Sequence, residues 1–534
     1  MKRPRSPSPS PTSMCPSAEP APPIPTHHPP FPLTPLEHRL FTLLLDVVRE
    51  QALPNLTLRV AGGWVRDKLL RPHADLGTAV DIDIALDTML GRDFAERINA
   101  YLLDHGLHAS SVGLIQKNPD QSKHLETATM RVMDVWLDLV NLRTETYSHD
   151  SRIPDVAIGT PLEDAMRRDL TINALFYNIN TAALEDHTHR GFDDIRARLV
   201  RTPLPPLTTL LDDPLRALRA VRFASRLNFS VDSALFDACR DTNVHAALGA
   251  KVSRERISAE IDRCMGCENP SHAIGLLIEL SLFPVVFRIP PEDELVDEPR
   301  PPPDLPALAL GALLNLRAFP EPAGAAPLRI ARYAALLSSL AACRCLFADC
   351  GRKRRPNPVV LYMLRGDLRL ASKDAAEVVA IHATALQLRE LVHRGSASLD
   401  RLEIGKVLRA SGPTWRSALQ NALIMELEPA KGLETYRNGV DGIRVELSDE
   451  MKVLAKAYDE FGKRIEEMGL DGVWEVKPAV NGNELMKLLP RLRKGPMIGT
   501  IMEEQIDWMI KNPKEGADGV RAWLVEKYAE LANT

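Results

Sequence analysis

Apolar residues in the first third of the chain recur with periods that predict alternating helices and strands. From Leu36 to Val47 they recur every three or four positions, directly after Thr34-Pro35-Leu36-Glu37, a capping box with proline at the first helical position. Short or alternating apolar runs predict strands at 56–63, 80–86, 108–116, 124–133 and 134–142, and helical spacing predicts helices at 64–71 and 91–105. Residues 34–180 are therefore expected to form a mixed α/β domain.

From Thr160 onward the apolar pattern is helical almost to the end of the chain. A second capping box, Thr160-Pro161-Leu162-Glu163, predicts the start of a helix that includes residues 165–176. The expected fold class is α+β: a mixed sheet with helices, followed by an all-α remainder. The expected parts are a disordered Pro- and Ser-rich tail (1–33), a head (34–180), a helical neck (181–287), an acidic Pro-rich loop (288–306), a helical body (307–440) and a helical tail (441–534).

Composition says more about the compartment and the partners of the protein than about any reaction it catalyses. The net charge of −5 provides no general basic field, so any nucleic-acid surface must be a local patch. No apolar run approaches the ~18 residues of a membrane span, so no membrane partner is expected. Seven cysteines in 534 residues suggest a reducing compartment. The sequence thus favours an intracellular protein, in cytosol, nucleus or mitochondrion, and implies no stable protein partner.

The segment VDIDIAL at residues 80–86 places two acidic residues inside a predicted strand. Because strand side chains alternate between faces, Asp81 and Asp83 are expected to point to the same side. Two carboxylates on one face repel each other, and a divalent cation between them removes that cost; Mg²⁺ prefers carboxylate oxygens and takes one or two from protein. The alternative is an edge strand whose acidic face is simply in water.

Gly62-Gly63 lies between a predicted strand and a predicted helix, where backbone can approach a ligand closely. The first turn of the helix offers unpaired N–H groups to phosphate oxygens, and Arg66 adds a bidentate donor. A tight turn alone would explain the glycines equally well. Followed by Asp81 and Asp83 on the next strand, however, the pattern predicts a phosphate site beside a metal site, as phosphoryl or nucleotidyl transfer requires.

Five motifs in order over residues 55–290 resemble those of the tRNA nucleotidyltransferases (CCA-adding enzymes), in the class II branch of the polymerase-β-type nucleotidyltransferases, and are most similar to the fungal members. They are GGWVRD (62–67) with DID (81–83), AMRRDLTINALFYNI (165–179), GFDDIRARLVRTPL (191–204), DDPLRALRAVRFASRLNF (212–229) and KVSRERISAEI (251–261). The resemblance implies a polymerase-β-like catalytic head and a neck, body and tail that hold the acceptor arm and elbow of tRNA.

The resemblance also implies the reaction. A metal-dependent enzyme of this family adds or repairs the 3′-terminal CCA of tRNA from CTP and ATP without a nucleic-acid template, and releases pyrophosphate. Asp81 and Asp83 are then expected to hold Mg²⁺. Asp138, in the run VWLDLVNLR (135–143), matches a third acidic position that polarises the 3′-hydroxyl or completes the metal site, although a structural role is also open.

The fourth motif offers a physical means of choosing bases. Asp213 and Arg216 are three residues apart, so on a helix they share a face. A carboxylate accepts from an exocyclic amine and a guanidinium donates to a ring nitrogen, a pattern that cytosine and adenine satisfy. Uracil and guanine would leave buried polar groups unpaired, at about 1–3 kcal/mol each. The alternative is an ordinary ion pair on a surface helix.

Further basic and polar residues extend the predicted nucleotide site. Arg219 and Arg222 continue the three-residue spacing from Arg216 and predict a stripe of guanidiniums that a polyanion or several carboxylates would neutralise. The resemblance assigns such positions to the incoming nucleotide and its triphosphate. By resemblance, Arg168 contacts the triphosphate as well. The residues expected to contact sugar and base are Arg167, Asp169 and Asn173. Each of them could instead brace the local structure.

Three other functions compete with complete CCA addition. Some enzymes of this kind add only CC or only the terminal A. A poly(A)-polymerase relative would share the first two motifs, but the fourth motif as written argues against it. A catalytically inactive tRNA-binding scaffold belongs to a different class, and the intact carboxylates of Asp81 and Asp83 oppose it.

Overall fold

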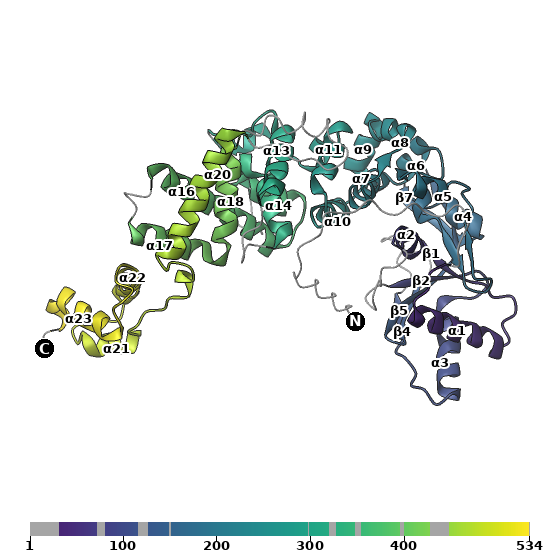
Figure 1. Cartoon of the computed structure of the whole chain (residues 1–534), viewed down its shortest axis with the longest axis horizontal. Helices are drawn as coiled ribbons and strands as arrows, with labels where there is room; N and C mark the ends of the chain where they lie inside the picture. The colour runs from purple at the N-terminus through teal and green to yellow at the C-terminus, as the bar shows by residue number, and fades with distance from the viewer. Residues whose placement is uncertain are drawn as a thin grey trace. The chain divides into compact units, whose positions relative to one another are not determined.

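The computed structural model describes residues 31–71, 81–115, 127–148, 151–296, 298–319, 327–347, 354–395, 400–427 and 448–532. The chain divides into two compact units, Met1–Arg256 and Ile257–Thr534. The first contains a mixed sheet and the second is mostly helical, which confirms the predicted α+β class (Figure 1). The predicted disordered tail lies outside the described residues except for positions 31–33. None of the helices in the described ranges is both long enough and apolar enough to cross a bilayer.

The first unit is built on a seven-stranded sheet with the order β3-β4-β5-β2-β1-β8-β9. Its strands are β1 (Leu58–Ala61), β2 (Ile82–Leu86), β3 (Gly113–Ile115), β4 (Thr127–Val132), β5 (Val135–Asn141), β8 (Phe176–Asn178) and β9 (Ala183–Glu185), with a separate hairpin β6 (Arg143–Ser148) and β7 (Ser151–Ile158) and a short pair β10 (Leu199–Val200) and β11 (Ser230–Val231). The helices are α1 (Pro35–Glu50), α2 (Gly63–Leu70), α3 (Gly91–Asp104), α4 (Pro161–Met166), α5 (Gly191–Arg196), α6 (Pro206–Asp212), α7 (Leu215–Leu227), α8 (Ser233–Cys239) and α9 (Thr242–Lys251).

The capping box predicted for the first helix is present. The Thr34 hydroxyl accepts the Glu37 N–H at 3.2 Å, and the Glu37 carboxylate accepts the Thr34 N–H at 2.7 Å. Leu40, Leu44 and Val47 are fully buried along one side of α1, as the helical period requires. Glu37 also pairs with Lys68 at 2.5 Å, which ties α2 to α1.

Strand β2 lies inside the sheet and carries the acidic pair. It runs antiparallel to β1, with Val60 opposite Ile84, and parallel to β5, with Asp83 opposite Asp138. Ile82 and Ile84 are buried, whereas the Asp83 side chain is accessible to solvent. Helix α3 packs against β4 and β5. The predicted alternation therefore holds, and the acidic face of β2 is open.

The helix predicted through residues 165–176 is wrong after its first turns. Helix α4 ends at Met166, a 3₁₀ turn spans Thr171–Asn173, and Phe176–Asn178 forms strand β8. Strand β8 pairs antiparallel with β1, with Tyr177 opposite Val60. Pairing with the free edge of β1 outweighs the local helical pattern because it buries Phe176 completely and satisfies the backbone of β1.

The second unit consists mainly of packed helices. They are α10 (Arg254–Met265, which begins in the first unit), α11 (Pro270–Glu279), α12 (Phe283–Val286), α13 (Leu305–Ala318), α14 (Leu328–Leu336), α15 (Val359–Leu361), α16 (Ser372–Arg394), α17 (Arg401–Ser411), α18 (Trp415–Glu426), α20 (Asp449–Glu467), α21 (Gly482–Leu488), α22 (Pro496–Lys511), α23 (Ala517–Lys527) and α24 (Ala529–Ala532). Helices α13, α14, α16 and α18 pack against one another.

The acidic segment 288–306, predicted as a loop, contains a 3₁₀ turn and a short strand. Strand β12 (Leu295–Val296) pairs with β13 (Arg344–Phe347), which pairs in turn with β14 (Arg355–Pro358). The sequence pattern missed this sheet because its strands are short and because β12 pairs with residues about fifty positions further along the chain.

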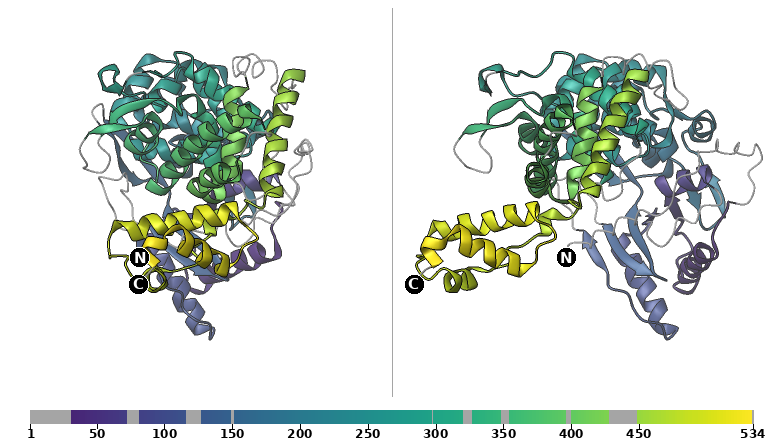
Figure 2. Two further views of the ribbon diagram at one scale, coloured as in Figure 1. Left: turned by 90° about the vertical axis from the view of Figure 1, so that its left-hand side faces the viewer. Right: turned by 60° about the vertical axis from the view of Figure 1, so that its left-hand side comes forward.

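The last four helices form a cluster with its own small core, visible as the yellow group in Figure 2. Its fully buried members include Leu485, Leu489, Ile501 and Leu524. The Arg401 guanidinium donates to the Ile510 carbonyl at 2.5 Å, so α17 is bonded to the C-terminal end of α22.

Protonation of the buried His382 is expected to destabilise the second unit in acid. The ring Nε2 lies 2.7 Å from the Ala334 carbonyl, and burial lowers the pKa of His382 to about 4 from 6.5. Because the unfolded chain binds the proton more tightly, the stabilisation is complete above pH 6.5 and is lost as pH falls toward 4. We expect the free energy of unfolding to be about 2 kcal/mol lower at pH 5 than at pH 7.5 through this group. Urea denaturation of the wild type and of His382→Gln checks this, and equal pH dependence in both would contradict it.

Candidate active site

A cavity of about 740 Å³ opens in the first unit, where β1, β2, α4 and α7 converge. Most residues that the motifs single out line it. Those are Gly62, Gly63, Arg66, Asp81, Asp83, Arg167, Arg168, Asp169, Asn173, Asp213, Arg216 and Arg219. Asp138 and Arg222, also predicted as site residues, are not part of the lining. Residues 150 positions apart in the chain thus meet around one space.

Two carboxylates, Asp81 and Asp83, line one edge of the cavity, and a third, Asp138, lies on the neighbouring strand. Asp81 directly precedes β2, Asp83 lies in β2, and Asp138 lies opposite Asp83 on β5. Although Asp83 is accessible to solvent, the concave site withdraws much of its water; this desolvation, with the neighbouring charge of Asp138, raises the pKa of Asp83 to about 6 against the opposing effect of Arg168. A cation at this edge would relieve that repulsion.

The donors at the acidic edge fit Mg²⁺ better than a metal held by protein alone. Within the described ranges, no group of three or more His, Cys, Asp or Glu side chains is arranged to hold a metal ion. Mg²⁺ needs only one or two carboxylates when phosphate oxygens and water complete its shell. Asp81 and Asp83 are the residues that would hold it.

The glycine turn leads from β1 into α2, and its first residue is closely approached by Arg168. Gly62 has a φ of +75°, and a Cβ at this position would lie 2.8 Å from Nη1 of Arg168. The backbone conformation therefore favours glycine, and a side chain here would also displace the Arg168 guanidinium. The turn and the first residues of α2 line the cavity together with Asp81 and Asp83.

Arg66 is buried, at 2% exposure, and its contacts hold the site together. It pairs with Asp67 at 2.7 Å, donates to the side-chain oxygen of Asn173, and lies 4.9 Å from the Phe223 ring centre. These contacts brace α2 against the 3₁₀ turn and α7. Its role as a phosphate ligand stays a prediction.

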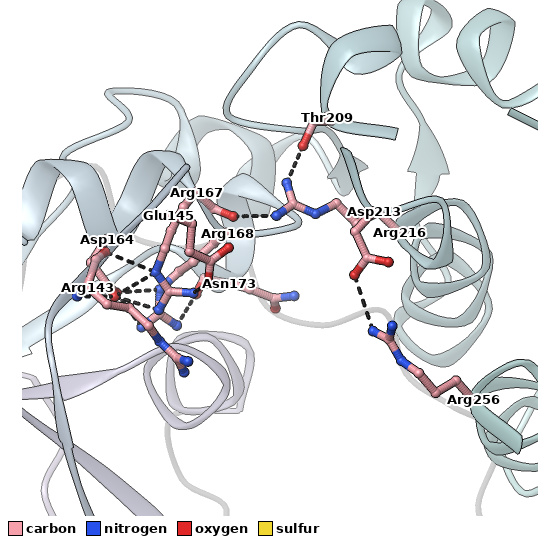
Figure 3. Close-up of polar contacts among 10 residues, drawn as sticks. All are labelled: Arg143, Glu145, Asp164, Arg167, Arg168, Asn173, Thr209, Asp213, Arg216 and Arg256. Carbon is pink, nitrogen blue, oxygen red and sulfur yellow. Dashed lines mark hydrogen bonds and ion pairs between the residues drawn. The ribbon is translucent and has the colours of Figure 1, made fainter. Parts of the chain in front are cut away.

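A buried carboxylate that the sequence analysis missed organises the two arginines of the second motif (Figure 3). Asp164 is 2% exposed and accepts from Arg167 at 2.5 Å and from Arg168 at 2.8 Å. It also accepts the Arg143 backbone N–H at 3.1 Å, and Glu145 on β6 accepts from Arg167 at 2.8 Å. The spacing of three and four residues before Arg167 and Arg168 on a helix was a usable signal for Asp164; Glu145 had none.

The charges around Asp164 leave it ionised. Burial by itself would raise the pKa of this carboxyl, but the guanidiniums of Arg168 and Arg167 outweigh burial and lower the pKa of Asp164 to about 2. Asp164 and Glu145 together balance the charges of the two guanidiniums. Both arginines line the cavity.

Asp169 and Asn173 form a second buried network. The Asp169 carboxylate accepts from Arg219 at 2.7 Å and from the side-chain amide of Asn173 at 3.1 Å. Burial would raise the pKa of Asp169, but Arg219 and these hydrogen bonds hold it below its ordinary value. The predicted contact residues therefore support one another.

Asp213 and Arg216 line the same cavity, but they do not share a helix. Asp213 has an extended backbone at the end of α6, and Arg216 lies in the first turn of α7, with its N–H bonded to the Asp213 carbonyl at 3.0 Å. Pro214 stands between them because the proline ring favours the start of a new helix over continuation of the old one. The cap turn, and not helical spacing, brings the two side chains to one wall.

Both groups of this pair have partners (Figure 3). The Arg216 guanidinium donates to the Thr209 hydroxyl and, at 2.7 Å, to the Arg167 carbonyl. The Asp213 carboxylate lies 3.3 Å from Arg256. Arg167 therefore connects the Asp164 network to the Asp213–Arg216 pair.

The predicted stripe of arginines turns away from the cavity at its third member. Residues three and six positions on from Arg216 are rotated by about 60° and 120° around the helix axis, and Arg222 is buried outside the lining. Its guanidinium lies 4.0 Å from the Phe223 ring centre, where Arg66 and Arg219 also stack. The triphosphate role of Arg222 remains untested, and its position favours a structural one.

Comparison with known protein families first identifies the broad class of the protein. The profile of the "Poly A polymerase head domain" matches residues 58–201, and that of the "Probable RNA and SrmB- binding site of polymerase A" matches 228–292. Together with the acidic edge and the glycine turn, these matches define a nucleotidyltransferase of the polymerase type, and so an enzyme.

Related proteins that align with almost the whole chain identify the family within this class. The mitochondrial CCA tRNA nucleotidyltransferase of Saccharomyces cerevisiae is 34% identical over 91% of this chain and 92% of its own, and the tRNA nucleotidyltransferase cca1 of Schizosaccharomyces pombe is 31% identical over 88% and 91%. The solved CCA-adding enzyme of Bacillus stearothermophilus, in complex with CTP, shares the fold with a TM-score of 0.57 at 20% identity over 93% of this chain and 99% of its own. The chain belongs to the CCA-adding tRNA nucleotidyltransferases.

Proposed function

We propose that this enzyme adds or repairs the 3′-terminal CCA of tRNA from CTP and ATP, with release of pyrophosphate. The observation that carries the proposal is the single cavity that unites an acidic edge, a glycine turn, paired arginines and the Asp213–Arg216 pair. One bound nucleotide would contact all four, because its base and its phosphates, with the metal ion on them, are held in the same site. We propose that the enzyme acts inside the cell, in the cytosol, the nucleus, the mitochondrion or several of these.

In the reaction, the 3′-hydroxyl oxygen of the RNA attacks the α-phosphorus of the nucleotide. The bond from that phosphorus to the bridging oxygen of the β-phosphate breaks, and pyrophosphate leaves with the electron pair. Asp81 and Asp83 would hold Mg²⁺, which neutralises charge on the attacking and leaving oxygens when bound. Asp138, opposite Asp83 on β5, would polarise the hydroxyl and take its proton.

The remaining residues position the nucleotide. The glycine turn and Arg168 face the phosphates, with Arg168 fixed by Asp164. Asp213 accepts the exocyclic amine and Arg216 donates to the ring nitrogen of cytosine or adenine. Because a protein pair reads the base, no template strand is required.

Arg216→Ala is expected to relax base choice. Without the guanidinium, uracil and guanine no longer face an unmatched donor, so discrimination falls by roughly ten- to a hundredfold, corresponding to about 1–3 kcal/mol. Misincorporation of UTP and GTP on a tRNA ending in CC measures this, with Arg196→Ala on the surface of α5 as a matched control. Unchanged selectivity together with weaker tRNA binding would refute the role in base reading.

Three substrates test the whole proposal. Purified protein is given a tRNA lacking CCA, one ending in C and one ending in CC, each with labelled CTP or ATP. Incorporation in the order C, C, A on the appropriate substrates is expected. Activity confined to CTP or to ATP would identify a partial enzyme, and no incorporation with retained tRNA binding would identify a scaffold.

A further inference from the structure

One large aromatic residue lies exposed on the open face of the sheet, beside the acidic edge. Trp136 in β5 is 37% exposed, whereas Val135, Leu137 and Leu139 of the same strand are buried. Side chains alternate along a strand, so Trp136 lies on the same face as Asp138, two residues on. An indole exposed to water loses the stabilisation that burial in the core would give, so a purely structural role does not explain its position.

The register of the sheet places Trp136 next to the first metal carboxylate. Ile82 on β2 pairs with Leu137 on the parallel strand β5, so one residue earlier Asp81 neighbours Trp136. On its other side Trp136 pairs with Arg131 of β4. Arg131 is exposed and forms an ion pair with Asp134 at 3.3 Å.

The order of strands separates this aromatic from the nucleotide cavity. In the order β4-β5-β2-β1, the glycine turn follows β1 on one side of the acidic strand, and Trp136 lies on the other side. In-line transfer requires the attacking oxygen to approach opposite the leaving pyrophosphate. If the phosphates lie at the glycine turn and Arg168, the 3′ end of the RNA approaches the site from the side of β5 and β4.

We propose that Trp136 stacks on the base of the 3′-terminal nucleotide of the RNA acceptor, and that Arg131 contacts the adjoining phosphate. The proposal rests on the proposed function and adds a subsite for the RNA end. Stacking suits this task because the enzyme must accept an end that changes with each addition. Every base presents a π-face, whereas hydrogen-bond readout would favour one base.

Variants at Trp136 test the subsite by steady-state kinetics. With a tRNA ending in CC, Trp136→Ala is expected to raise the KM for RNA about tenfold, since stacking is worth roughly 1–3 kcal/mol per base, and to leave the KM for ATP within about twofold. Trp136→Phe, which keeps a ring, should stay near wild type. Leu103→Ala on α3, at 60% exposure, is the matched surface control.

A second measurement reads the contact without turnover. A tRNA with 2-aminopurine as its last nucleotide should lose fluorescence on binding wild type and Trp136→Phe, and lose less on binding Trp136→Ala. An unchanged RNA KM and equal quenching in Trp136→Ala would overturn the proposal, as would an equal rise in the KM for RNA and for ATP. Failure of the wild type to extend any tRNA would instead count against the proposed function.

Discussion

Asp81→Ala abolishes nucleotide incorporation, by at least about a thousandfold in kcat, while the protein stays folded. The carboxylate precedes β2 at an exposed position, so its removal creates no cavity in the core. Its loss takes away one of the two groups that would hold the metal ion against the triphosphate, and with it the charge stabilisation on which transfer depends. Labelled ATP incorporation on a tRNA ending in CC measures the loss.

The control for Asp81→Ala is Asp104→Ala, which removes an exposed carboxylate at the end of α3. It should retain full activity. Circular dichroism and thermal unfolding should be the same for both variants and the wild type. If Asp81→Ala unfolds the first unit, the acidic pair is structural, and the account of the active site is wrong.

Asp164→Asn lowers kcat/KM for CTP and ATP by about a hundredfold. The substitution keeps the size of the side chain but removes its negative charge. Arg167 and Arg168 stay partly buried and lose their ion pairs with Asp164. Removing one partner of a buried ion pair typically costs about 3–5 kcal/mol, because the remaining charge stays desolvated. The two guanidiniums should separate, and Arg168 should leave the wall that faces the phosphates.

The pH range of this effect follows from the lowered pKa of Asp164. With a pKa of about 2 in the folded protein against 3.8 for an exposed Asp, its stabilisation is present above pH 4 and is lost only as pH falls toward 2. The difference in unfolding free energy between Asp164→Asn and wild type should therefore be constant from pH 5 to 8. Urea denaturation across that range measures it.

Asp193→Asn is the matched control for Asp164→Asn. Asp193 forms an i,i+3 pair with Arg196 on α5 at 2.9 Å but is largely exposed, and such pairs contribute little. It should leave both stability and kinetics near wild type. Wild-type KM values for CTP and ATP in Asp164→Asn would show that the arginines do not depend on this carboxylate.

Much of the head could be predicted because its signals are local. The capping box at Thr34 and the alternation around Asp81 and Asp83 each involve residues within one turn or one strand. Such features are fixed by backbone geometry before any distant contact forms. The order of the five motifs likewise required no structure, and it led to the family that the comparisons confirm.

The contacts that complete the site could not be predicted in the same way. Glu145 lies 22 residues from Arg167 on another strand, and Arg256 lies 43 residues from Asp213. Nothing in the local pattern marks either residue as a partner. The strand β8 was missed for the same reason, since only the free edge of β1 turns residues 176–178 away from a helix.

The sequence by itself determined which chemistry this protein carries: two carboxylates on one strand face, a glycine turn, and a family of motifs for nucleotide and tRNA. The tertiary structure decided which arginines face the cavity, which carboxylate holds them, and that Trp136 lies exposed beside Asp81. The physical reason is the separation along the chain over which each interaction acts. Periodicity and capping act over a few residues, whereas ion pairs and strand neighbours depend on how distant segments pack.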